Sequence, residues 1–150
     1  MHRRIEGVLG NLRDFPVGAR TLERVGVGSD AMTRRLLRLP SSIGDLGVTL
    51  GDDVRLQDGD VLVADPALVI AVAVQPDDVL VLYPASIAQA LEVGHALGNR
   101  HVPVIADGEG FVIAYADALE SLFVRMGVRY ERTARVLERP FVHAHAPHVH

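Results

Sequence analysis

The pattern of apolar residues changes near residue 75, and this change limits the fold more than any other feature of the 150-residue chain. Before it, glycines and other turn residues separate short apolar runs at 48–50, 54–56, 61–63 and 68–74. Short strands separated by turns are typical of a compact β-domain. The stretch 34–39 lies in the same series and is interpreted as a further strand. Residues 1–75 are therefore predicted to form a small N-terminal β-domain.

Beyond this point, strand-like and helix-like segments alternate. Residues 79–83 are a continuous apolar run of strand length. A helix is predicted next, because Ile87 and Leu91 begin a series of apolar residues at helical spacing. Gly98 and Asn99 then allow the tight, left-handed backbone that ends a helix.

The rest of the second half predicts two strands, a helix and a last strand. Strands over 101–105 and 110–115 are joined by an Asp-Gly-Glu-Gly hairpin signal. Asp117 can cap a second helix, which Gly127 ends, and 128–137 alternates imperfectly like a strand. The order βαββαβ is the ferredoxin-like plan, so the fold class is predicted to be α+β.

Composition argues against several classes of function. The formal charge is −4 with neutral histidines, which argues against nucleic acid as a partner. The absence of cysteine removes disulfides, thiolate zinc sites and cysteine catalysis. The sequence contains neither a signal-peptide core nor an apolar run of membrane-spanning length, so a cytoplasmic location away from the membrane is expected. Aspartates beside turn signals are interpreted as solvated turn residues rather than as a hard-cation site.

Histidines gather late in the chain, where six of the seven follow residue 94. Imidazole is well suited to nickel, copper and zinc, and no thiolate competes with it here. Residues 76–140 are assigned to the second domain, and 141–150 are expected to form a mobile tail without secondary structure. The tail carries four of the histidines: His143, His145, His148 and His150.

Three segments resemble a known family. Residues 97–103 read Leu-Gly-Asn-Arg-His-Val-Pro, 57–62 read Gln-Asp-Gly-Asp-Val-Leu, and 116–120 read Ala-Asp-Ala-Leu-Glu before a leucine-rich stretch. Together with the histidine-rich tail, they resemble the UreE family of urease accessory metallochaperones. The Leu-Gly-Asn-Arg-His core is specific in this context, whereas the Asp-Gly-Asp turn alone carries little weight.

The resemblance implies a nickel-delivery protein without enzymatic activity. In the family, the equivalent of His101 meets its two-fold mate in a homodimer and the pair bridges a metal ion. Tail histidines would complete the ligand shell. The expected cargo is Ni²⁺, with Cu²⁺ or Zn²⁺ also binding in vitro, and the expected partners are the accessory GTPase and the urease apoprotein. The N-terminal domain would bind peptides or partner proteins.

The sequence also departs from the family. Residues 114–118 contain no histidine where many members have one, so the additional metal sites are predicted to be absent. His95 lies one residue before the position where members commonly carry histidine, and Ala96 occupies that position; His95 is therefore not predicted to be a ligand. The alternative function is a ferredoxin-like interaction or nucleic-acid-binding module with incidental histidines.

One basic strip in the first domain has two interpretations. Arg34, Arg35 and Arg38 would lie together on a strand. The strip could dock the acidic surface of another accessory protein, or it could be a solvated strand face.

Overall fold

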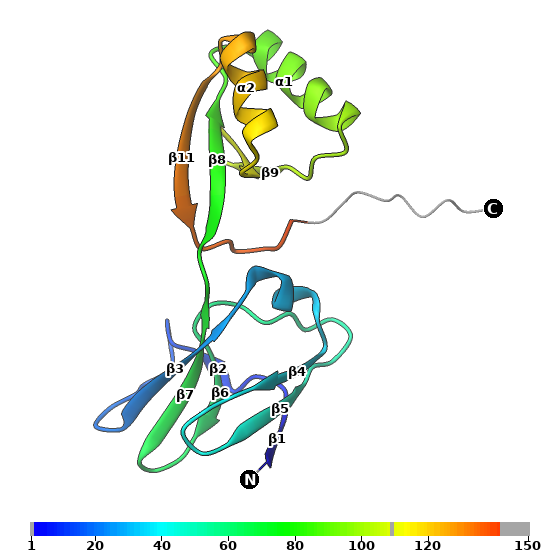
Figure 1. Ribbon diagram of the computed structural model, residues 1–150. Helices are drawn as coiled ribbons and strands as arrows, with labels where there is room; N and C mark the ends of the chain where they lie inside the picture. The colour runs from blue at the N-terminus through cyan, green and yellow to red at the C-terminus, as the bar shows by residue number, and fades with distance from the viewer. Residues whose placement is uncertain (1, 109, 142–150) are drawn as a thin grey trace, which may run out of the picture. The chain divides into compact units, whose positions relative to one another are not determined.

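The computed structural model describes residues 2–108 and 110–141. The chain divides into two compact units (Figure 1). The first contains residues 2–76 together with 136–140, and the second contains 77–135 and 141. No helix in the described part of the chain is long and apolar enough to cross a membrane. The four tail histidines lie outside the described residues.

The first unit consists of two sheets. Its elements are β1 (His2–Glu6), β2 (Gly10–Asn11), β3 (Thr21–Val27), the 3₁₀ helix η1 (Ser29–Thr33), β4 (Leu36–Leu39), β5 (Asp45–Thr49), β6 (Asp60–Ala64) and β7 (Leu68–Val74). One sheet has the order β1-β5-β4 and the other β2-β6-β7-β3. Both contain a parallel pair, β1 with β5 and β3 with β7. A predominantly β first half was therefore predicted correctly.

Both sheets contribute to one apolar core. Leu46 and Val48 of β5 are buried in the same cluster as Ile70 and Val72 of β7. The run 61–63 lies within β6 and 68–74 forms β7, as predicted, and 48–50 overlaps β5. The prediction of a strand over 54–56 was wrong, although Leu56 of this irregular segment is fully buried. Burial of one side chain does not require the hydrogen-bond ladder of a strand.

The predicted strand over 34–39 is shorter in the structure and begins at Leu36. Arg34 ends the 3₁₀ helix and forms an ion pair with Asp30. Arg35 pairs with Asp52, and only Arg38 lies within β4. The three arginines therefore do not form a single strand face.

The Asp-Gly-Asp turn before β6 is tied into the first unit. Asp60 is buried, and its carboxylate accepts hydrogen bonds from the backbone of Gln57 at 2.7 Å and from Asn11 Nδ2 at 3.0 Å. Asp58 Oδ1 accepts one from the backbone of Val74 at 2.9 Å. The interpretation of these aspartates as solvated was wrong for Asp60, which has a structural role.

The second unit has the predicted ferredoxin-like order of elements. They are β8 (Asp77–Tyr83), α1 (Ile87–Asn99), β9 (Ile105–Asp107), β10 (Gly110–Ala114), α2 (Asp117–Met126) and β11 (Arg129–Arg135). The sheet has the order β11-β8-β10-β9, and every pair is antiparallel. Both helices lie on one face of it (Figure 1) and bury a shared apolar core against Leu80 and Leu82 of β8.

The helix predicted after the first strand of this unit is confirmed as α1, but its first two apolar residues do not face the core. Val93 and Leu97 are fully buried, whereas Ile87 and Leu91 are 90% and 73% exposed. The strand predicted over 101–105 is present, but its predicted bounds were wrong, because β9 spans Ile105–Asp107. Helical spacing identifies a face of the helix, but it does not identify what that face contacts.

Candidate functional site

His101 has an unusual backbone conformation directly after α1. Its φ is 55°, and it is the only residue other than glycine with a positive φ in the described part of the chain. Its backbone N–H donates to Gly98 O at 3.0 Å, and that of Val102 donates to Leu97 O at 3.1 Å. This pair of bonds is the Schellman motif, which places a left-handed residue directly after the helix cap.

The left-handed turn was expected at Gly98 and Asn99, but these residues complete the helix and His101 makes the turn. Left-handed backbone costs an L-residue about 1–2 kcal/mol, and glycine avoids the cost. Histidine tolerates it better than most residues. Val102 packs against the core that contains Leu97 and so anchors the turn. The imidazole of His101 is therefore held on an exposed, well-defined corner.

The exposed side of α1 leads from Ile87 toward this corner. At 100° per residue, Gly94 and Gly98 lie on the same line as Ile87 and Leu91. A Cβ atom built at either glycine would have open space around it. This face therefore offers two large apolar side chains, followed by a flat backbone surface beside His101. The helical spacing of Ile87 and Leu91 is visible in the sequence, but it does not indicate whether that face of the helix is covered or exposed.

His95 lies on α1, six residues before His101. It is exposed, and its Nε2 is 3.2 Å from Nδ2 of Asn99. Because the amide nitrogen of Asn99 can only donate, this hydrogen bond makes Nε2 the acceptor. The contact engages one of the two ring nitrogens through which an imidazole can bind a metal ion.

The start of α2 carries a hydrogen-bonded network. The Tyr115 hydroxyl donates to Asp117, and Tyr130 donates to Glu120 at 3.1 Å. The hydrogen bond to Asp117 raises the pKa of Tyr115 to about 12. Asp117 was predicted to cap α2, but Ala116 is the cap residue and its side chain makes no capping bond.

Arg132 ties this network to the sheet. It donates to both carboxylate oxygens of Asp78, at 3.1 and 2.8 Å, and this holds the pKa of Asp78 below its usual range. Its guanidinium group also stacks over the Tyr115 ring at 3.5 Å. The network thus connects β8, the end of β10, α2 and β11.

No three metal-binding side chains come together within residues 2–108 and 110–141. Of the predicted metal ligands, the structure places His101 on the exposed corner after α1. The others, in the tail, lie outside the described residues. One imidazole is too little for a stable site, so His101 would need ligands from a second copy, from the tail, or from both.

Comparison with known proteins identifies the family. The family model described as UreE urease accessory protein, N-terminal domain, matches residues 5–75. The family model for the UreE C-terminal domain matches residues 77–150. The chain belongs to the UreE family of urease accessory proteins. The match to the C-terminal domain thus includes the turn at His101 after α1, the hydrogen-bonded network at the start of α2 and the histidine-rich tail.

Several named relatives cover nearly the whole chain. The urease accessory protein UreE of Corynebacterium efficiens is 36% identical over 147 residues, covering 96% of this chain and 99% of its own. UreE of Bacillus cereus is 34% identical over 140 residues, which is 93% of each chain. UreE of Paenarthrobacter aurescens is 36% identical over 158 residues, covering 96% and 99%. As a UreE protein, the chain takes part in urease maturation and is not an enzyme.

Proposed function

We propose that this UreE chain carries nickel as a homodimer and that His101 of each copy contributes to one shared metal site. The observation that supports this proposal best is the conformation of His101. An exposed imidazole occupies a left-handed position where glycine would cost less, and strained backbone of this kind is concentrated at functional sites.

The exposed side of α1 is the proposed dimer surface. Ile87 and Leu91 expose most of their surface, and a second copy would cover both in each protomer. Gly94 and Gly98 would let the two α1 helices approach closely, because they carry no side chain. A two-fold axis beside these glycines would bring the two His101 corners together, and thus supply a second imidazole to the site.

The tail would supply the remaining ligands. His143, His145, His148 and His150 together with His101 make up the proposed ligand set. A site assembled from imidazoles of two chains would exchange metal readily, as delivery to the accessory GTPase and the urease apoprotein requires. Copper should bind at least as tightly as nickel in vitro, because the affinity of nitrogen ligands rises from nickel to copper. Residues 1–75 would engage partner proteins.

The test is nickel titration by calorimetry of the native chain, His101→Ala and a version ending at Val142. We expect His101→Ala to abolish the tightest site, at about one ion per dimer, and truncation to remove weaker capacity. His95→Ala is the matched control, since it removes an exposed imidazole of the same unit and should leave the tightest site intact. Unchanged tight binding in His101→Ala would refute the proposal. Retention on nucleic acid at physiological salt would favour the binding-module alternative.

A further inference from the structure

A trough crosses the outer face of the β1-β5-β4 sheet in the first unit. Its volume is about 390 Å³, and its lining includes His2, Arg4, Leu36, Arg38 and Gly47. The strand register places Arg4, Gly47 and Arg38 side by side across the three strands. The trough exists because the central strand has no side chain at Gly47. The imidazole of His2 lies over this gap, where a Cβ atom on Gly47 would be 2.6 Å from its Nε2.

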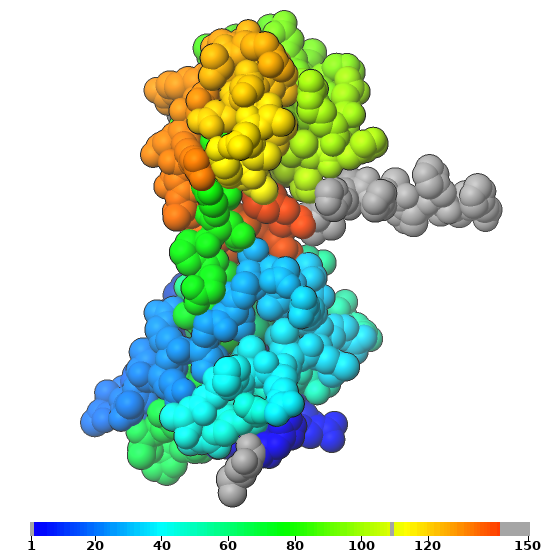
Figure 2. All heavy atoms as spheres, viewed as in Figure 1, coloured from blue at the N-terminus to red at the C-terminus, as the bar shows by residue number. Residues whose placement is uncertain are grey.

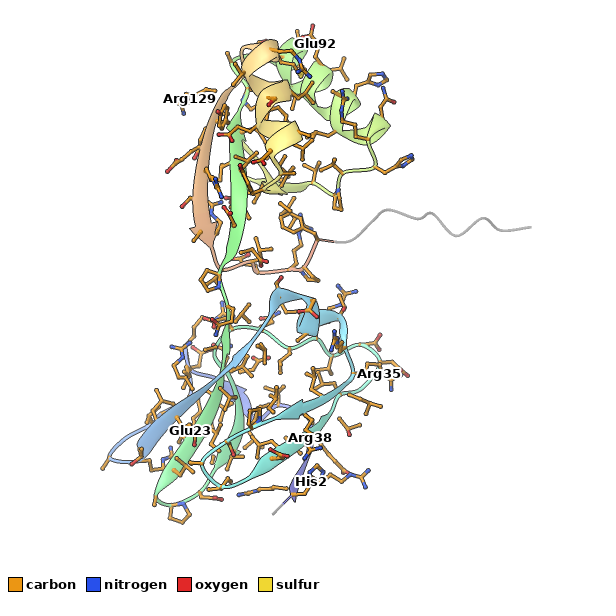
Figure 3. The ribbon with its side chains drawn as sticks, viewed as in Figure 1. His2, Glu23, Arg35, Arg38, Glu92 and Arg129 are labelled. Carbon is orange, nitrogen blue, oxygen red and sulfur yellow. The ribbon has the colours of Figure 1, made fainter. Side chains whose placement is uncertain are left out.

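The trough combines two exposed arginines, each paired with a carboxylate on the same face of the sheet, with an exposed apolar side chain. Leu36 is 73% exposed, on the same outer face as Arg38. No carboxylate is among the residues that line the trough. Figure 3 shows His2 and Arg38 on the same side of this unit, and Figure 2 shows β1 at the surface beside the segment that contains β4 and β5.

Both arginines can exchange their present partners at little cost. Arg4 Nε pairs with Glu6 at 2.9 Å, and Arg38 Nε donates to Asp45 at 2.7 Å. The side chains of Arg4 and Arg38 are 73% and 76% exposed, and such solvated ion pairs contribute little to stability. A carboxylate brought by another molecule could therefore replace Glu6 or Asp45.

We infer that this trough docks an acidic segment of a partner protein. Carboxylates of the segment would pair with Arg4 and Arg38, and an apolar side chain would cover Leu36. The two-arginine trough on a chain of net charge −4 is too small a basic surface for nucleic acid. A second copy docking by the same face would bring no excess of carboxylates, because its Glu6 and Asp45 are already paired with its own arginines. The inference rests on the proposed engagement of partner proteins by residues 1–75, and it is independent of the metal site proposed at His101.

Gly47→Val tests the inference most sharply. The φ of Gly47 is not positive, so valine is compatible with the strand, and β-branched residues favour strands. The new side chain would fill the trough, and only the end of the flexible His2 side chain has to move. The melting temperature and nickel binding should therefore remain unchanged.

The probe is a fluorescein-labelled aspartate-rich peptide with spaced leucines, and binding is measured by fluorescence anisotropy on the full chain. A lysine-rich peptide with the same leucines is the probe control. We expect the acidic peptide alone to bind, with an affinity that falls as salt rises. Gly47→Val and the double variant Arg4→Gln/Arg38→Gln should each weaken binding by roughly tenfold or more.

The matched control is Arg55→Gln/Arg125→Gln, which makes the same change of charge at two exposed arginines that do not line the trough. It should bind the acidic peptide like the native chain. Amide NMR shifts on peptide addition should centre on Leu36, Gly47 and Thr49. Equal binding of the lysine-rich peptide, undiminished binding by Gly47→Val, or shifts centred outside this sheet would each overturn the inference.

Discussion

The two helices of the second unit end in the same way but with different residues. After α2, Gly127 has a φ of 66°, its N–H donates to Val124 O at 3.2 Å, and that of Val128 donates to Phe123 O at 3.3 Å. After α1, His101 and Val102 make the equivalent two bonds. Each motif is followed by a valine packed on the same core.

Glycine is the residue that stability favours at such a position. The α2 motif follows that rule and the α1 motif departs from it, although one fold contains both. Because the geometry is shared, the requirement for a left-handed turn does not explain the histidine. What distinguishes the two ends is the imidazole itself, which makes it the group to test.

Replacing His101 by glycine and Gly127 by histidine should have the largest effect on nickel binding. We expect His101→Gly to lose the tight nickel site while its free energy of unfolding stays within about 1 kcal/mol of the native value, because glycine relieves the left-handed strain but adds flexibility to the unfolded chain. Gly127→His should lower the free energy of unfolding by about 1–2 kcal/mol and create no tight site. Nickel calorimetry and urea unfolding measure both quantities. Retained tight binding by His101→Gly would show that the unusual residue serves something else.

The exposed faces of the two helices should also differ. Ile87→Asp/Leu91→Asp is expected to convert the proposed dimer to monomer and to remove the proposed tight nickel site, because two buried charges on each α1 would oppose association. Val124→Asp on α2, where the native side chain is 64% exposed, is the control and should leave the dimer intact. Light scattering after size exclusion gives the masses. If the doubly substituted chain remains a dimer, the dimer interface does not lie on the exposed face of α1.

The starts of the two helices also differ in their hydrogen bonds, and this difference should have a smaller effect, on the pH dependence of stability. Ser86 accepts a hydrogen bond from Gln89 N at 3.1 Å at the start of α1, whereas α2 begins with the tyrosine network. The folded pKa of Tyr115 is raised to about 12. Its contribution to stability is therefore complete below the unfolded value near 10 and is lost as pH rises through about 12.

This ionisation can be followed by ultraviolet absorbance, because the chain has three tyrosines and no tryptophan. Tyr115→Phe should remove a component that titrates near pH 12 in the folded chain, and it should leave nickel binding unchanged. An alkaline titration identical to that of the native chain would show that the network does not hold this phenol.

Much of the second unit was predictable because local patterns and tertiary packing agree there. The apolar run of β8 and the glycine after α2 each identified their element within a few residues. In the first unit, β1, β2 and β3 were not predicted, because exposed and charged residues dominate β1 and only two residues form β2. Their strand state depends on partners distant in sequence, such as β5 for β1 and β7 for β3.

The sequence by itself determined the family and the ferredoxin-like order of elements, and it made His101 the candidate metal ligand, because these depend on short motifs and local periodicity. Only the tertiary structure decided that His101 is left-handed, that Ile87 and Leu91 face outward, and that Arg4 and Arg38 flank Gly47. Each of these depends on which surfaces pack together and which strands pair. Spacing along the chain does not specify that information, because the same apolar or basic pattern suits either a covered or an exposed face.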